Sequence, residues 1–253
     1  MIHGYRGDHH GLQLFCDALP EYRVLIPDIP VFGASGTWPT GVRSIEDYGR
    51  WLREFLVHTD TRDAVVLGHS FGSIVVANAL QGTRTEPIVL VNPISQKALN
   101  GPKKVLAALG SSWYRIGAIL PIRAANAFLS WGLIVRLMSI VLAKTSNPTI
   151  RRWIHEQHDL YFSSYSDRDS LIGGYYVSTG SDVSEFASSI VAPVLLIAAD
   201  KDDITPLYAQ RRVQSLFPTS ELHIIAGVGH LVHYEKPIET AEIIRNFLLK
   251  QFR

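Results

Sequence analysis

Short apolar runs separated by amphipathic stretches dominate the pattern of hydrophobic and polar positions along the chain. Runs typical of buried strands occur at residues 22–26, 65–69, 87–91, 193–198 and 221–226. Because these runs are apolar on both faces and alternate with amphipathic helices, they predict an α/β fold. The expected architecture is a mostly parallel central sheet with helices on both faces.

Three helices of this core are predicted from apolar spacing and end signals. One short helix follows residue 12, and a second begins after Ser44, a good N-cap, with Glu46 and Asp47 in the first turn. In that second helix the apolar positions recur at helical spacing: Ile45, Tyr48, Leu52, Phe55 and Leu56. The last helix begins at about Pro237 and has one apolar face. These helices are expected to cover the sheet.

The alternation of strands and helices stops between residues 95 and 190. Helical patterns dominate there, with breaks at residues 101–102, at Pro121 and at residues 147–148. We predict a helical cap, residues 95–190, inserted into a core made of residues 1–94 and 191–253. Residues 124–143 are apolar enough to suggest a membrane span, but Asn126 and Arg136 interrupt them, so a cap helix is favoured.

Candidate chemistry begins at residues 65–73, where an apolar strand runs into Gly68-His69-Ser70-Phe71-Gly72 and then into a helical stretch. Gly-x-Ser-x-Gly in this setting is typical of a nucleophile elbow, a tight turn that exposes the serine hydroxyl. The backbone N–H of Phe71, at the start of the helix, can hold a developing oxyanion. Ser70 is therefore the candidate nucleophile, and it needs a base, a group that orients the base, and a second oxyanion donor.

The base and the acid are sought in loops after later strands. His230 follows Gly229 in the loop after residues 221–226, with His233 and His69 as rivals. Three carboxylates follow residues 193–198, namely Asp200, Asp202 and Asp203. The residues alone do not choose among these three.

The order of these motifs resembles that of the α/β-hydrolase superfamily, in which serine, acid and histidine each follow a strand. His3-Gly4 resembles the oxyanion loop of that family, and residues 28–35 resemble the loop after its next strand. Two features depart from the pattern. Val31 stands where the family usually has glycine, and only two residues precede His3, so the N-terminal strands are missing or truncated, or the start is placed too late.

The resemblance implies roles for particular residues. Ser70, Asp202 and His230 would be the catalytic triad, and the backbone N–H groups of Tyr5 and Phe71 would form the oxyanion hole. Tyr5, Phe71 and Leu231 would contact the substrate. The resemblance implies no cofactor and no metal.

Two further patterns were weighed for other chemistry. His155 and His158 lie three residues apart, whereas the zinc-hydrolase pattern needs histidines four apart, so a metal site is disfavoured. Cys16 is the single cysteine and is expected to pack within its helix, which leaves no intrachain disulfide.

Charge and termini limit the partners. The formal net charge is +1, which gives no electrostatic case for nucleic acid. No basic and apolar leader opens the sequence, so a cytoplasmic location is the expectation. The charge is uneven, however, because no acidic residue lies between Glu86 and Glu156. We therefore weigh two hypotheses for the basic, aromatic cap. In the first, the cap contacts an anionic partner, either a membrane surface or an acidic substrate. In the second, its lysines and arginines are merely solvated.

The predicted function is hydrolysis of a carboxylic ester, or a related acyl compound, with a hydrophobic moiety. The ester would be cleaved through an acyl-enzyme on Ser70, as in carboxylesterases and lipases of class EC 3.1.1. Alternatives on the same scaffold are a carbon–carbon hydrolase of ring-cleavage products, which often carries tryptophan where this chain has Leu231, and a cofactor-free perhydrolase or lyase. A non-catalytic ligand-binding protein is a further alternative, and the oligomeric state is left open.

Overall fold

A parallel sheet forms the centre of the computed structural model, which describes residues 1–38, 44–82, 84–98, 104–162 and 164–252. Its strands are β1 (Val66–His69), β2 (Ile88–Val91), β3 (Val194–Ala199) and β4 (Ser220–Ile225), adjacent in that order. All three pairings are parallel. Ile2 adds an isolated parallel bridge to Gly68. The predicted α/β fold is confirmed.

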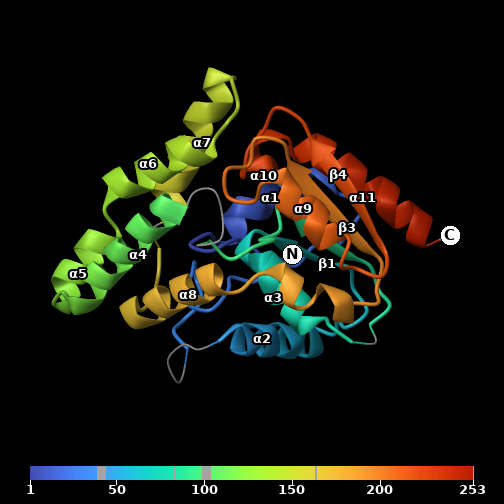
Figure 1. Ribbon diagram of the computed structural model, residues 1–253, viewed down its shortest axis with the longest axis horizontal. Coiled ribbons are helices and arrows are strands. Elements are labelled where there is room, and N and C mark those ends of the chain that lie inside the picture. The colour runs from blue at the N-terminus through green and yellow to red at the C-terminus, as the bar shows by residue number, and fades with distance from the viewer. Residues whose placement is uncertain (39–43, 83, 99–103, 163, 253) are drawn as a thin grey trace.

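Helices cover both faces of the sheet, in which β1 to β3 are fully buried and β4 is partly exposed. Successive side chains of a strand point to opposite faces, so Val66, Ile88 and Leu90 belong to one core cluster and Leu67 and Val89 to the other. The first cluster packs under α2 (Ile45–His58) and α3 (Phe71–Ala79). The second packs under α1 (Gln13–Ala18) and α11 (Pro237–Gln251), on the opposite side of the sheet in Figure 1.

The start of α2 shows how local sequence sets an element boundary. Ser44 is the N-cap in extended conformation, and the Asp47 carboxylate accepts a hydrogen bond from the Ser44 N–H at 3.1 Å. This capping interaction satisfies groups that the first turn of a helix leaves without partners. Two remaining core helices are α9 (Leu207–Gln214) and α10 (Val232–Glu235), and α10, only one turn long, was not predicted.

In the described part of the chain, five helices lie between residues 104 and 180, a segment that is called the cap below. They are α4 (Lys104–Ile119), α5 (Ile122–Leu129), α6 (Gly132–Leu142), α7 (Pro148–Tyr161) and α8 (Arg168–Gly180). Pro121 and Asn147 are the N-caps of α5 and α7, as the predicted breaks require, whereas residues 101–102 lie outside the described residues. Figure 1 shows α4 to α7 projecting from the sheet, while α8 returns towards it. The exact limits of an inserted domain, 95–190, stay a prediction.

One predicted strand is wrong. Residues 23–29 belong to no helix or strand, and a hydrogen bond joins the Met1 amino group to the Leu25 carbonyl at 2.7 Å. The segment that would pair with it contributes only Met1 and Ile2, and Ile2 bonds to β1 instead. An apolar run without a strand beside it cannot form a ladder.

Close backbone packing holds the turn between β1 and α3. A methyl group at Gly72 would lie 2.3 Å from the Ile2 carbonyl oxygen, and one at Gly68 would lie 2.5 Å from the Gly72 carbonyl oxygen. These neighbours are backbone atoms, which cannot move aside as a flexible side chain can. The two glycines of the motif are therefore required by packing.

Gly72→Ala should lower the free energy of unfolding by about 1–3 kcal/mol or more, because the new methyl group overpacks backbone against backbone. Gly180→Ala is the matched control, since no heavy atom lies within 4 Å of its added methyl group. The control should be unchanged or stabilised by up to about 1 kcal/mol. Urea denaturation of both variants measures the difference, and equal stabilities would contradict this view of the turn.

Candidate active site

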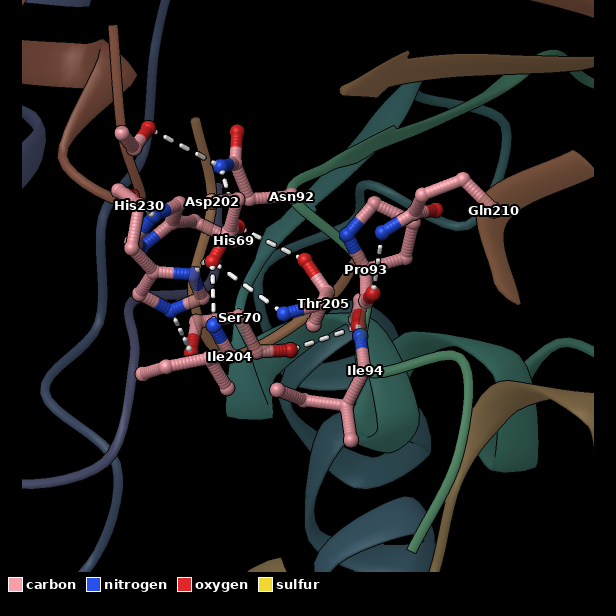
Figure 2. A network of polar contacts seen from close by, with 12 residues as sticks. His69, Ser70, Asn92, Pro93, Ile94, Asp202, Ile204, Thr205, Gln210 and His230 are labelled. Atoms are coloured by element: carbon pink, nitrogen blue, oxygen red, sulfur yellow. Dashed lines mark hydrogen bonds and ion pairs between the residues drawn. The ribbon is translucent and has the colours of Figure 1, made fainter. Parts of the chain in front are cut away.

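The carboxyl ends of the parallel strands bring four loop residues to one edge of the sheet. Ser70 follows β1, Asn92 follows β2, Asp202 lies beyond β3, and His230 lies in the loop after β4. Parallel strands end at the same edge, which is where open α/β sheets commonly bind ligands. Figure 2 shows these side chains converging.

Ser70, His230 and Asp202 form a continuous hydrogen-bonded row. The Ser70 Oγ lies 2.8 Å from His230 Nε2, and His230 Nδ1 lies 2.8 Å from Asp202 Oδ2. Nδ1–H donates to the carboxylate, which leaves Nε2 free to accept the serine proton. Ser70 itself has φ 53° and ψ −121°, a strained conformation for a residue other than glycine. The turn thus holds the hydroxyl towards the histidine.

Asp202 is buried and surrounded by donors. Its Oδ2 accepts hydrogen bonds from Asn92 Nδ2 at 2.7 Å and Thr205 Oγ1 at 2.6 Å, and its Oδ1 accepts from the Ile204 and Thr205 N–H groups. Burial alone would raise the pKa of Asp202. The neighbouring His230 and these hydrogen bonds outweigh burial and lower the pKa to about 2. Asp202 is therefore a carboxylate at neutral pH.

Asn92 and Thr205 were missed by sequence reasoning. The available signal was their position, since Asn92 directly follows β2 and Thr205 lies three residues beyond Asp202. Asn92 also donates to the Gly229 carbonyl at 3.2 Å, and its φ of 43° is left-handed. It therefore links the acid to the histidine loop.

The rival acids point elsewhere. Asp200 is exposed and accepts a hydrogen bond from the Gly227 N–H, while Asp203 forms an ion pair with Lys144 at 2.7 Å. Among the described carboxylates of this cluster, Asp202 is the one that contacts His230. The hydrogen bond to His230 thus falls on the carboxylate that the family resemblance implied.

The rival bases lie behind His230. His69 Nε2 is 3.2 Å from the His230 carbonyl oxygen, and the His233 ring packs against His69 with a centroid separation of 4.1 Å. Burial, with a smaller contribution from the nearby His230, lowers the pKa of His69 to about 3. Burial likewise holds the pKa of His233 well below the ordinary value. Both rings are therefore neutral packing groups at neutral pH.

The predicted oxyanion donors flank Ser70. A methyl group placed on Gly4 would lie 3.2 Å from Ser70 Cβ and 3.6 Å from Ser70 Oγ, so the backbone entering Tyr5 passes directly beside the hydroxyl. Phe71 is the first residue of α3, where the N–H has no partner within the helix. His3 fixes this loop, since its Nε2 accepts the Ile29 N–H at 2.9 Å and its Nδ1 donates to the Gly4 carbonyl.

Val31, in the loop after residue 28, adopts a left-handed backbone conformation. This buried valine has a φ of 88°, in the region that glycine occupies without strain. Its N–H donates to the Gly36 carbonyl, and its carbonyl accepts the Ser166 N–H from the cap side. Asp28 adds hydrogen bonds from the N–H groups of His9 and Ala34. Backbone hydrogen bonds at both ends therefore hold Val31 in this conformation.

Aromatic rings gather around Tyr5. Its ring lies edge-on to Phe32 and Phe71, and 6.2 Å from Tyr114 and Tyr175 of the cap. The Tyr5 hydroxyl donates to the Leu171 carbonyl at 2.8 Å, which ties the oxyanion loop to α8. The site is thus bordered by apolar rings from both core and cap.

Leu231 faces the cap. It is buried in a cluster with Leu142, Ala143, Ile154 and Tyr234, where the end of α6 and the middle of α7 meet the loop that carries His230. Its predicted contact with substrate stays a prediction, and its observed role is in core-to-cap packing.

Arg6, next to Tyr5, is a buried cation that sequence reasoning missed. It donates to the Leu129 and Phe162 carbonyls at 3.0 and 3.2 Å and to the Tyr114 hydroxyl at 3.3 Å. Leu129 ends α5 and Phe162 caps α7, and the carbonyl ends of helices carry partial negative charge. Within the part of the chain that the structure describes, no carboxylate forms an ion pair with Arg6. Helix ends therefore take the place of a counter-ion and join the oxyanion loop to the cap.

The histidine pair weighed as a metal site is engaged in hydrogen bonds. His155 Nδ1 and His158 Nδ1 both lie against Ser139 Oγ, at 2.6 and 2.7 Å. Asp8, His9 and His10 have ligand atoms within 4.8 Å of one another, but Asp28 and Asp8 already bond the two histidine rings. These contacts explain the orientation of the rings without an ion.

Fold and site together define a hydrolase class, and comparison with known proteins agrees. The model of the alpha/beta hydrolase family matches residues 1–243, and the chain belongs to this family. It is similar to the uncharacterized hydrolase YugF of Bacillus subtilis (strain 168), with 22% identity over 98% of this chain and 88% of that protein.

Two solved structures illustrate the likeness of the fold. One is a thermophilic esterase from Thermogutta terrifontis, with a TM-score of 0.77 and 21% identity over 99% of this chain and 88% of that one. The other is a bromoperoxidase from Bacillus anthracis, with a TM-score of 0.76 and 20% identity over 98% and 90%. At these identities the likeness establishes the fold.

Asp202→Asn should lower kcat by about 10³–10⁴-fold, because an amide cannot hold the His230 tautomer or offset its developing charge. Asp203→Asn is the matched control, since it removes a neighbouring carboxylate that pairs with Lys144 outside the triad. The control should keep kcat within a few-fold. Steady-state kinetics on any turned-over ester gives both values, and equal losses would contradict the assignment of Asp202.

Buried neutral histidines should make stability pH-dependent. Between pH 6.5 and about 3 the unfolded chain binds a proton at His69 that the folded chain does not, so the free energy of unfolding falls as the pH falls. His69→Gln keeps an N–H donor but does not titrate, and should flatten this slope by up to about 1.4 kcal/mol per pH unit. Urea denaturation between pH 6.5 and about 3 measures this slope in the wild type and the variant. Equal slopes would contradict a buried, neutral His69.

Proposed function

We propose that this protein is a serine hydrolase that cleaves a carboxylic ester, or a related acyl compound, through an acyl-enzyme on Ser70. The observation that carries the proposal is the row from Ser70 Oγ through His230 to Asp202, with both hydrogen bonds at 2.8 Å. A serine hydroxyl becomes a useful nucleophile when an adjacent base takes its proton and a third group orients that base.

The first half of the proposed reaction forms the acyl-enzyme. Ser70 Oγ attacks the substrate carbonyl carbon while His230 Nε2 takes the hydroxyl proton, and the carbonyl oxygen becomes an oxyanion. The N–H groups of Tyr5 and Phe71 donate to this oxyanion, and Asp202 stabilises the charged imidazole. His230 then returns the proton to the departing alkoxide, so the carbon–oxygen bond breaks and an alcohol leaves.

The second half consumes water. His230 takes a proton from a water molecule, whose oxygen attacks the acyl carbon and forms a second oxyanion between the same donors. Collapse of this intermediate breaks the bond to Ser70 Oγ, and His230 returns the proton to the serine. The products are a carboxylic acid and free enzyme, and no cofactor takes part in either half.

A hydrophobic substrate moiety is supported by the surroundings of Ser70. Tyr5, Phe71, Tyr114 and Tyr175 place aromatic rings at the boundary between core and cap. Pockets for small molecules are mostly apolar, with a few placed polar groups. The likeness to an esterase structure is consistent with the proposal.

A series of p-nitrophenyl esters of increasing acyl length tests this function. We expect kcat/KM to rise with each added methylene up to a medium chain, by at most about fourfold per step, because burying a methylene contributes about 0.8 kcal/mol. Ser70→Ala is the control and should remove turnover of every ester. A ring-cleavage dienoate is included, and turnover of the dienoate with inactivity on all esters would replace the proposal by carbon–carbon hydrolysis.

A further inference from the structure

The outward face of α6 is apolar although it is exposed. Six apolar side chains occupy this face. Ile134 is partly buried, and the other five are exposed: Leu133, Leu137, Met138, Ile140 and Val141. At 100° per residue these positions cover an arc of about 160° without a polar residue. A helix on the surface of a soluble domain normally turns polar residues outward.

The inward face of the same helix is the more polar one. Val135, Ser139 and Leu142 are buried, and Ser139 Oγ bonds to His155 and His158 of α7. The bonds to α7 account for the buried Ser139 hydroxyl. Nothing in the described part of the chain buries Leu133 and Leu137, which are about half exposed. The outward face is therefore suited to a second apolar environment.

Charge identifies the kind of environment. Every charged residue from position 87 to position 155 is basic. Arg123 of α5 is exposed and has no carboxylate partner among the residues that the structure describes. Arg136 flanks the apolar arc of α6, but Asp159 of α7 pairs with it, so part of its charge is offset within the chain. Trp131, half exposed, is the N-cap of α6, and tryptophan is favoured at the boundary between membrane and water. Apolar, basic and aromatic groups together match an anionic lipid surface.

Two other occupants fit less well. In a symmetric dimer built on this face, each patch would meet its own copy, and basic residues would face basic residues. A transmembrane span is suggested by composition, since residues Ile122–Leu142 are long and apolar enough. In the structure, however, this stretch is two helices of 8 and 11 residues, each reaching at most about 17 Å, whereas the hydrocarbon core of a bilayer is about 30 Å thick.

We propose that the outward face of α6, with Trp131 and the neighbouring arginines, docks the protein on the surface of an anionic membrane. The helix lies along the interface with its leucines among the acyl chains, while Arg136 and Arg123 of α5 lie at the lipid headgroups. Because α6 leads directly into the Leu142–Leu231 contact beside His230, docking would place the cap side of the active site towards the membrane. Membrane contact does not require ester hydrolysis, so each proposal can fail without the other.

Flotation with lipid vesicles tests this docking. The full chain is mixed with vesicles of phosphatidylcholine alone or of phosphatidylcholine with phosphatidylglycerol, at low and at high salt. We expect binding to the anionic vesicles, weaker binding at high salt, and little binding to the neutral ones, because salt screens attraction to headgroups. Absence of binding to both, or equal binding to both, would overturn the proposal.

A pair of variants locates the contact. Leu137→Asp with Ile140→Asp should weaken binding to anionic vesicles by about tenfold or more, because charged groups must then enter the interface. The matched control is Ile238→Asp with Leu249→Asp, two exposed apolar positions on α11. Circular dichroism and thermal melting show that both variants stay folded.

The variants also separate lipid from self-association. Equal vesicle binding by the two variants would overturn the assignment to α6. Light scattering on the protein without vesicles tests for self-association. If the wild type is a dimer and Leu137→Asp with Ile140→Asp is a monomer, this face binds a second copy of the chain instead of lipid.

Discussion

The close passage of the chain through the turn at Ser70 is the constraint on which the rest of the structure depends. Ser70 holds a left-handed φ of 53°, and the backbone of Ile2 and Gly72 leaves no room for side chains beside it. Such strain persists only where surrounding packing over-determines it. Here β1 and α3 are buried along their whole length, and the same contacts bring Gly4 to the serine. The same backbone packing thus exposes the Ser70 hydroxyl and brings the predicted oxyanion donors beside it.

Buried charge is handled differently at the two sides of the site. Hydrogen bonds from His230, Asn92 and Thr205 stabilise the Asp202 carboxylate locally, which keeps it ionised despite burial. Arg6 instead draws on helix ends and aromatic faces of the cap, including Trp113 with its ring centroid 5.5 Å from the guanidinium carbon. The first arrangement orients a base, and the second attaches the cap to the oxyanion loop. Electrostatic contacts therefore serve both the row of Ser70, His230 and Asp202 and the junction between core and cap.

Much of this could be predicted from the sequence, because strong local signals coincide with function. Gly68 to Gly72 fixed the position of the turn, and apolar runs located β1 to β4, since buried parallel strands leave a clear pattern. The signals failed where tertiary pairing decides. Residues 22–26 have strand composition but no strand beside them among the described residues. The residues alone did not separate Asp202 from Asp200 and Asp203; the family resemblance indicated Asp202, and the structure shows that this carboxylate faces His230. The role of Arg6 and the inverted polarity of α6 depend on contacts between distant helices, which no single segment encodes.

The central claim is that Ser70 is a nucleophile activated by His230 and Asp202, and mapping a covalent adduct tests it most directly. Two samples are treated with a fluorophosphonate, one folded and one denatured in urea beforehand, and both are digested and analysed by mass spectrometry. We expect one adduct in the folded sample, on the peptide that contains Ser70, and no adduct in the sample that was denatured before labelling. We also expect slower labelling in Asp202→Asn than in wild type. No adduct on the folded wild type, or an adduct on a different residue, would contradict this claim.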